Sequence, residues 1–194
     1  APLGADAVYD ILFREALEGA PDAGGLLAYN QLAGEPIAGL DEGRPLFVRT
    51  PESRLNLANV MRAQLYGVFG TLALGLRVLA HEDVVIDRMY AHGGMFRTAG
   101  VAARFLAGAL AAPVSTSKTA AEGGAWGMAV LAAYAAYAAS GARSGLREYL
   151  GDRVFAATDL VTADTEPDDI AGFAAYLDRY ASGLDVVRAA IDAV

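Results

Sequence analysis

Residues 84–140 constrain the fold more than any other part of the sequence. Hydrophobic patterning predicts four elements there in the order strand, helix, strand, helix, over residues 84–91, 98–111, 113–116 and 122–140. The connections between them are short, so the two strands should lie parallel in one sheet, with the first helix as a right-handed crossover. A mixed sheet with packed helices is an α/β fold. We expect a single domain over residues 1–194.

Further helices and short strands are expected before this segment. The predictions are a helix over residues 5–18, a buried strand near 24–30, a short strand at 46–49, and a helix over 50–80. In the long helix Thr50 is the expected cap and Pro51 the first helical residue. Glycines interrupt this helix, which predicts close packing against a neighbour. One of its faces carries Leu57, Val60, Met61, Leu65, Val68, Leu72, Leu76 and Leu79.

The tail over residues 164–194 repeats apolar residues at alternating spacings of three and four after a capping cluster at 165–168. This pattern fits two arrangements. We favour a C-terminal helix docked on its own domain, because only about three heptads are present and Gly183 interrupts them. The other arrangement is a coiled coil, which would form a homodimer.

Composition excludes several classes of function. A net charge of −8 argues against a nucleic-acid partner and against an anionic membrane surface. No cysteine and only two histidines are present, which excludes disulfides and cysteine–zinc sites and makes a histidine metal site improbable. The absence of cysteine fits a cytoplasmic protein. The carboxylates of residues 152–169 are interpreted as a solvated acidic surface with helix caps.

Residues 123–140 form an uncharged stretch of about the length of a membrane span. Alanine and glycine make up most of it, and such small side chains bury too little apolar surface to anchor in lipid. Small residues instead allow a helix to lie close on a sheet. The stretch is therefore predicted to be a buried core helix.

A candidate binding site is the turn that follows the first predicted strand of this segment. Ligands of open α/β sheets bind beyond the carboxyl ends of strands, where this turn lies. Gly93 and Gly94 would let a ligand approach the backbone, and Thr98 could cap the next helix or hydrogen-bond a ligand hydroxyl. The free N–H groups of that helix would attract an anion. A tight turn that needs positive φ accounts for the same glycines without a ligand.

A second candidate site begins at Glu122, before a glycine-rich helix start. Gly124 and its neighbour permit close approach of a loop or ligand, and Glu122 is expected to cap the helix. Trp126 could stack on a base, although filling core space is the favoured interpretation. His92 receives no catalytic role, because no paired carboxylate or nucleophile lies near it in the sequence.

Residues 90–134 carry a resemblance to a known family. The segment YAHGGMFRTAGVAARFLAGALAAPVSTSKTAAEGGAWGMAVLAAY resembles the adenosine-side signature of the FGGY carbohydrate kinases. That signature is a strand, a glycine pair, a helix, a short strand, and a Glu before a helix rich in glycine and alanine. Residues 3–17, residues 32–36 and the tail from Pro167 resemble other parts of the same domain, so the likeness spans essentially the whole chain.

The resemblance implies a fold, an activity and a set of contacts. The fold is one lobe of a two-lobe enzyme with the actin-like, ribonuclease H-like ATPase fold. The activity is transfer of the ATP γ-phosphoryl group, with Mg²⁺, to a sugar, a pentulose such as xylulose or ribulose. By the same likeness Gly93 and Gly94 lie beside the adenosine and α-phosphate, Thr98 lies near the base or ribose, and Met95 replaces a third glycine or alanine. With Gly124 these are the predicted nucleotide contacts.

The family's phosphate loops and catalytic Asp would lie N-terminal to Ala1. The chain is therefore expected to be part of a longer protein and to contain no catalytic or metal-binding residue. We expect ATP and ADP as its ligands, and sugar contacts mainly from an N-terminal lobe. On its own the chain should be inactive. The alternative is a non-catalytic nucleotide- or protein-binding α/β module.

Overall fold

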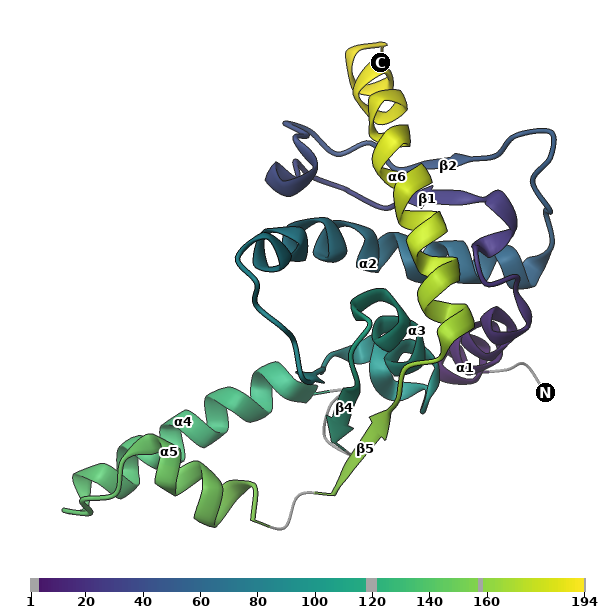
Figure 1. Ribbon diagram of the computed structural model, residues 1–194. Coiled ribbons are helices and arrows are strands. Elements are labelled where there is room, and N and C mark those ends of the chain that lie inside the picture. The colour runs from purple at the N-terminus through teal and green to yellow at the C-terminus, as the bar shows by residue number, and fades with distance from the viewer. Residues whose placement is uncertain (1–3, 118–121, 157–158, 194) are drawn as a thin grey trace.

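The computed structural model describes residues 4–117, 122–156 and 159–193 (Figure 1). A body that contains two small sheets carries an arm, formed mainly by α4 and α5, which projects away from it. The helices are α1 (Ala5–Glu15), α2 (Leu57–His81), α3 (Val101–Leu110), α4 (Gly123–Ala139), α5 (Leu146–Tyr149) and α6 (Pro167–Ala193). The strands are β1 (Leu27–Tyr29), β2 (Leu46–Val48), β3 (Met89–Tyr90), β4 (Val114–Ser117) and β5 (Leu160–Ala163).

The central helix α2 begins later than the sequence predicts. The cap is Asn56, whose side-chain oxygen accepts a hydrogen bond from the Asn59 N–H at 2.8 Å. Thr50 is not the cap, and Pro51 lies in a turn before the helix. The Ser53 hydroxyl accepts a hydrogen bond from the Thr50 N–H at 3.0 Å and closes that turn, so the chain cannot enter the helix there.

The buried face of α2 differs from the predicted leucine face. Leu65 is buried, but Leu57, Val68 and Leu72 are exposed. Polar and aromatic side chains of α2, such as Arg62 and Tyr66, are buried although hydropathy does not favour them. They have partners in the core, so the helix faces the core with a different side from the one predicted. Close packing at the glycines is confirmed, because a Cβ on Gly67 would overlap a carbonyl oxygen of β1. The buried residues of α2 are Ala58, Asn59, Arg62, Ala63, Leu65, Tyr66, Gly67, Phe69, Gly70 and Ala73.

The C-terminal helix α6 docks on the body, which confirms the favoured prediction. Its apolar side chains face α2, α3 and β1, so the seam that a coiled coil would use is covered. Tyr180 stacks on Tyr29 with ring centroids 4.6 Å apart, and the Tyr29 hydroxyl donates to the Tyr180 carbonyl at 2.9 Å. Tyr66 of α2 meets the edges of Phe105 and Phe173. Aromatic packing thus joins α2, α3 and α6.

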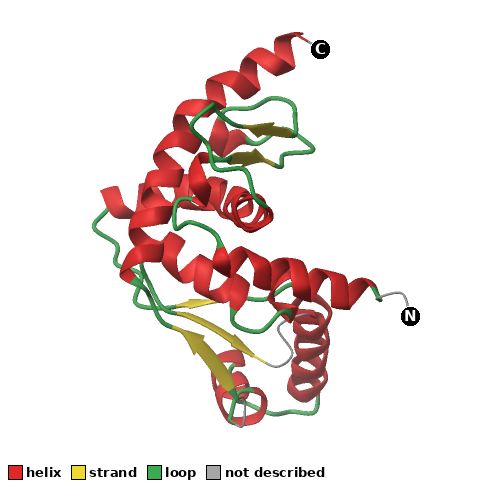
Figure 2. Cartoon of the chain, turned by 90° about the vertical axis from the view of Figure 1, so that its right-hand side faces the viewer, coloured by secondary structure: helices red, strands yellow, loops and turns green. Residues whose placement is uncertain are grey.

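The strands form two separate sheets. β1 and β2 pair antiparallel, and the second sheet has the order β3-β4-β5. β3 lies parallel to β4, as the strand–helix–strand pattern predicts, and β5 pairs antiparallel with β4. The strand expected over residues 84–91 is only two residues long, because 84–88 are irregular. Figure 2 shows the three-stranded sheet lying between the body helices and the arm.

One carboxylate of the predicted acidic surface lies in the core. Asp169 of α6 is 2% exposed and is hydrogen-bonded to Nε of Arg104. Its second oxygen lies 3.6 Å from a terminal nitrogen of Arg62, which is equally buried. The Arg62 guanidinium also lies over the ring of Phe105, 4.6 Å from the centroid. The prediction of a solvated surface was therefore wrong at Asp169, because two arginines compensate its charge.

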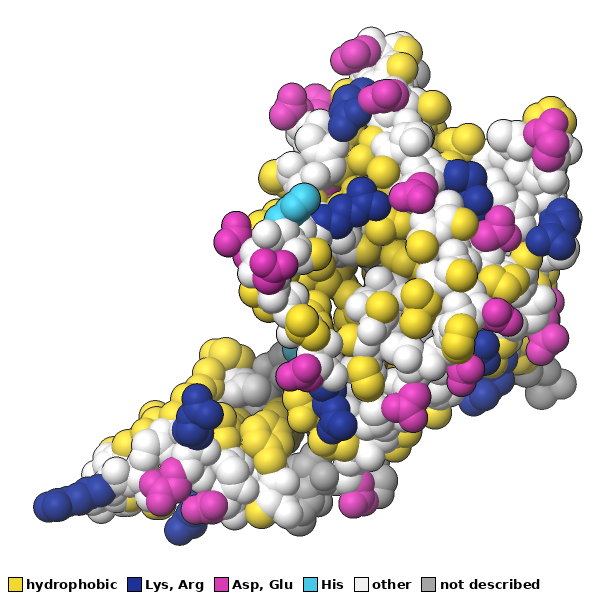
Figure 3. Space-filling model, viewed as in Figure 1, with side chains coloured by type: hydrophobic (Ala, Val, Ile, Leu, Met, Phe, Trp, Pro, Cys, Tyr) yellow, Lys and Arg dark blue, Asp and Glu magenta, His cyan; other side chains and the backbone are white. Residues whose placement is uncertain are grey.

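The arm corrects the prediction made for residues 123–140. Helix α4 has nearly the predicted bounds, but no residue in it is buried, so it is not a core helix. The sheet is three short strands wide and offers it no broad surface. Instead α4 packs on α5, where Tyr149 lies 5.3 Å from Tyr134 and 5.0 Å from Tyr137, measured between ring centroids. Figure 3 shows hydrophobic side chains exposed along the arm.

Among the described residues, α2 is the one helix long and apolar enough to cross a membrane by length and composition. A core helix passes the same test. In its most apolar window 39% of the residues are buried inside the structure.

Candidate functional site

A cavity of 590 Å³ opens at the carboxyl ends of β3 and β4. Ligands of open α/β sheets bind at such ends, and small-molecule sites commonly enclose roughly 300–1,000 Å³. The wall residues come from four segments: β3 with its following turn, β4, the start of α4, and the chain around the start of β5. They are Tyr90, Ala91, His92, Ser115, Ser117, Gly123, Trp126, Gly127, Phe155 and Leu160.

The parallel strands fix one side of the cavity. Tyr90 pairs with Ser115 in register, and the Ala91 N–H donates to the Ser115 carbonyl at 3.0 Å. The chain turns away after Ala91, which leaves His92 on the cavity wall. The Ser115 side chain is 1% exposed, and its hydroxyl lies 2.8 Å from the hydroxyl of Thr162 in β5. That hydrogen bond ties this side of the cavity to β5.

Aromatic rings from the arm form the opposite wall. Trp126 of α4 and Phe155 have ring centroids 5.6 Å apart with a 54° tilt. Trp126 is only half-buried, so the prediction that it fills core space was wrong. Phe155 follows a π-helical turn, η6 (Leu150–Val154), and its N–H donates to the Leu150 carbonyl at 2.8 Å. Turns of this type are frequent at functional sites.

The glycine pair lies beside the cavity and borders open space. Gly93 has φ 121°, in the region that favours glycine. A Cβ on Gly93, Gly94 or Gly124 would meet no atom of the described residues within 4 Å. The cavity lining includes their chain neighbours His92 and Gly123. The space next to these glycines is therefore free of packed side chains.

The helix expected over residues 98–111 begins later, at Val101. A 3₁₀ turn, η4 (Gly94–Arg97), intervenes, and α3 starts at Val101. Met95 within that turn packs against the hydrophobic core, and Thr98 after it is 6% exposed. The free N–H groups of α3 therefore lie farther along the chain from the glycines than predicted, because the left-handed Gly100 precedes the helix.

An ion pair joins the two candidate sites. Arg97 of η4 donates a hydrogen bond to a carboxylate oxygen of Glu122 at 2.8 Å. Glu122 occupies the N-cap position of α4 as predicted, but its side chain makes no cap hydrogen bond there and pairs with Arg97 instead. A Cβ on Gly123 would lie 2.6 Å from the His92 ring, so glycine is needed where α4 meets that ring. The turn after β3 and the start of α4, far apart in the sequence, therefore form one site.

The charge of the lining limits what the cavity can bind. No Asp, Glu, Lys or Arg side chain is among its described wall residues. Within residues 4–117, 122–156 and 159–193, no group of three or more His, Cys, Asp or Glu could hold a metal ion. The cavity is thus suited to an uncharged, largely apolar part of a ligand, and no described residue is assigned to magnesium.

Sequence reasoning found the glycines, Trp126 and His92 but missed Phe155 and Leu160. These two lie after the arm has folded back on α4, and no local pattern indicates that return. The presence of Ser115 on the wall follows from the predicted short strand, since strand ends and ligand sites coincide in parallel sheets.

Comparisons with known proteins identify the family of the chain. The model of the C-terminal domain of the FGGY family of carbohydrate kinases matches residues 4–136. The chain therefore belongs to the FGGY family of carbohydrate kinases. A search of curated proteins finds no match.

Solved structures give the fold. The chain is similar to a ligand-bound xylulose kinase from Lactobacillus acidophilus, with TM-score 0.72, 19% identity, and 96% of this chain and 36% of that chain covered. The chain is also similar to a gluconate kinase from the same organism, with TM-score 0.69, 18% identity, and 95% of this chain and 35% of that chain covered. A third similar structure is a xylulose kinase from Rhodospirillum rubrum, with TM-score 0.67, 18% identity, and 96% of this chain and 36% of that chain covered. The fold is therefore the actin-like, ribonuclease H-like ATPase fold, and the chain spans about a third of the length of these kinases.

Proposed function

We propose that this chain, as one domain over residues 1–194, is the nucleotide-binding C-terminal lobe of a cytoplasmic carbohydrate kinase. The kinase would transfer the γ-phosphoryl group of ATP to a sugar hydroxyl. A pentulose such as xylulose or ribulose is the proposed acceptor, because two of the three similar structures described above are xylulose kinases. The observation that carries the proposal is the cavity at the carboxyl ends of β3 and β4, beside glycines that border open space.

In this proposal the nucleoside half of ATP occupies the cavity and the phosphates leave it past the glycine pair. Uncharged apolar walls suit a base and a ribose, and they do not suit a triphosphate. Gly93, Gly94 and Gly124 would contact the nucleotide, since no side chain fills the space beside them. Met95 and Thr98 would hold the shape of the turn, because the first packs against the core and the second is buried.

Phosphoryl transfer also needs a magnesium ion, a group that orients the sugar hydroxyl, and a cleft that excludes water. None of the described residues is assigned to these tasks. We propose that the magnesium ligands, the catalytic residues and most sugar contacts come from an N-terminal lobe of the same kinase. The 194-residue chain alone would then bind ATP or ADP without phosphorylating a sugar. Turnover of xylulose by the purified chain would contradict this assignment.

A glycine substitution tests the nucleotide site in the whole kinase. Gly94→Val should raise the KM for ATP by about tenfold or more and leave the KM for the sugar nearly unchanged, because the new side chain occupies space meant for the nucleotide. The fold should tolerate it, since a Cβ there meets no atom within 4 Å. Equal changes in both KM values, or no change, would refute the site.

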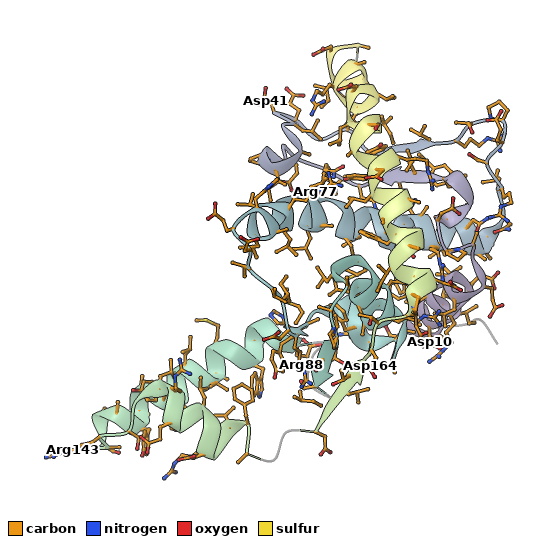
Figure 4. All side chains as sticks on the ribbon, in the orientation of Figure 1. Asp10, Asp41, Arg77, Arg88, Arg143 and Asp164 are labelled. Carbon is orange, nitrogen blue, oxygen red and sulfur yellow. The ribbon has the colours of Figure 1, made fainter. Side chains whose placement is uncertain are left out.

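Gly145→Val is the matched control. Gly145 is exposed, has φ −68°, and also borders open space. It lies in the arm near Arg143, which Figure 4 places at the arm's free end. This variant should leave both KM values unchanged. A rise in the KM for ATP in both variants would show that added bulk anywhere impairs the enzyme.

A further inference from the structure

The aromatic wall of the cavity extends beyond the part of the chain that the family model describes. That match ends at residue 136, whereas Phe155 follows η6 on the returning side of the arm. The ring centroids of Phe155 and Trp126 lie 5.6 Å apart and the ring planes are tilted by 54°, so the two rings meet at an angle on the cavity wall. A flat ring in the cavity can therefore stack on one of the two rings and meet the other at an angle, as aromatic pairs commonly do.

The polar groups of the cavity are poorly placed to read the edge of such a ring. A site discriminates strongly between hydrogen-bonding edges when its buried polar groups lose their only partner with the wrong ligand. Ser115 is the fully buried polar side chain among the described wall residues, and its hydroxyl already bonds Thr162. Tyr90 and His92 are exposed to water and lose little if a ligand leaves them unpaired. Ser117 is half-buried and already has an interaction within the chain.

From these two observations we propose that the cavity recognises a purine by stacking on Trp126 and Phe155 and does not read its edge. The kinase should accept ATP and GTP with affinities within about tenfold of each other. This inference rests on the proposed nucleotide-binding function and adds the class of nucleotide. Stacking tolerates different bases because every base has a π-face.

The sequence supplies its own probe, because Trp126 is the single tryptophan. Fluorescence of the 194-residue chain excited at the red edge of tryptophan absorption reports on the cavity wall. AMP and GMP should both quench it, with dissociation constants within about tenfold, whereas ribose 5-phosphate, which has no base, should not. A preference of about 100-fold or more for either nucleotide would overturn the inference.

Substitutions of Phe155 test the second ring. Phe155→Leu removes the ring but keeps an apolar side chain, and should weaken AMP and GMP alike by about fivefold or more. Phe155→Tyr keeps the ring and should restore binding. Phe47→Leu, at an exposed phenylalanine of β2, is the control and should change neither constant. Because Phe155 is also exposed, circular dichroism should show an unchanged fold in all three variants.

The outcomes separate the two levels of the argument. If neither AMP nor GMP binds the unmodified chain, the nucleotide cavity itself is refuted, and the inference with it. If both bind but Phe155→Leu binds as the unmodified chain does, the proposed function survives and the aromatic wall is refuted. If AMP binds much more tightly than GMP, some group must form hydrogen bonds with the edge of the adenine base. In that case only the proposal that both purines are accepted is refuted.

Discussion

Replacing Asp169 by Asn should destabilise the body strongly. The substitution keeps the shape of the side chain and removes one negative charge from between two arginines. Arg62 cannot escape to water, because it is 2% exposed and held over the ring of Phe105. The Arg104 guanidinium can reach water, because its side chain is 42% exposed. The cost therefore falls mainly on Arg62, which would keep a buried positive charge without a counter-ion.

The magnitude follows from that burial. Removing one partner of a buried ion pair typically costs about 3–5 kcal/mol, because the remaining charge is left uncompensated. In a domain of this size that corresponds to a fall in Tm of roughly 6–20 °C. Asp169→Asn should therefore lose a large share of the total stability, which is about 5–15 kcal/mol for most domains.

Urea unfolding followed by circular dichroism measures the loss, and a second substitution identifies its cause. Arg62→Met removes the stranded charge at similar length, so the double variant should be at least about 1 kcal/mol more stable than the sum of the single effects predicts. A loss below about 1 kcal/mol for Asp169→Asn, or strict additivity, would refute the assignment of this pair as a compensated buried charge.

The free energy of unfolding should fall above pH 10, because burial raises the pKa of Tyr66 to about 12 while an unfolded tyrosine titrates near 10. The unfolded chain then releases its proton first, and stability drops by about 1.4 kcal/mol per pH unit for this group; urea melts from pH 8 to 11 should show the decline, and Tyr66→Phe should reduce its slope. Gly67→Ala should destabilise the chain, because the new Cβ overlaps β1. Gly127→Ala adds a Cβ in open space on α4 and should stabilise that helix by about 0.5–1 kcal/mol. Thermal melts of the two variants and the unmodified chain measure both effects. Asn56→Ala should lower the free energy of unfolding by about 1 kcal/mol, and Thr50→Ala should lower it by less than about 0.5 kcal/mol. If urea melts show the opposite order, Thr50 and not Asn56 is the cap of α2.

The sequence predicted those parts of the fold that local patterns determine. The parallel pair β3–β4 with α3 between them follows from apolar runs separated by short connections, and the docking of α6 follows from its periodic apolar face. Close packing at Gly67 could be inferred because glycine inside a helix is costly unless a neighbour needs the space. These inferences need no knowledge of distant partners.

The parts that the sequence could not predict depend on contacts between distant segments. Asp169 was predicted to lie on a solvated surface, and no local pattern indicated that it pairs with Arg62 in the core. That pairing helps to determine which face of α2 is buried. The burial of α4 was predicted wrongly. Its composition of small apolar residues is compatible with burial, but composition does not indicate whether another element packs against the helix. In the candidate site Trp126 lies on the cavity wall and not in the core, contrary to its favoured interpretation, and Phe155 had no local signal.

The arm contributes no buried side chain to the core, since no residue of α4, α5 or η6 is buried. Its stability therefore comes from its own helix–helix packing, and it can unfold locally while the body remains native. Melting followed at Trp126 would then report a different, earlier transition than far-ultraviolet signals from the body, and a single two-state fit would mix the two. The cavity is consequently bounded on one side by a rigid structure and on the other by the less stable part of the molecule.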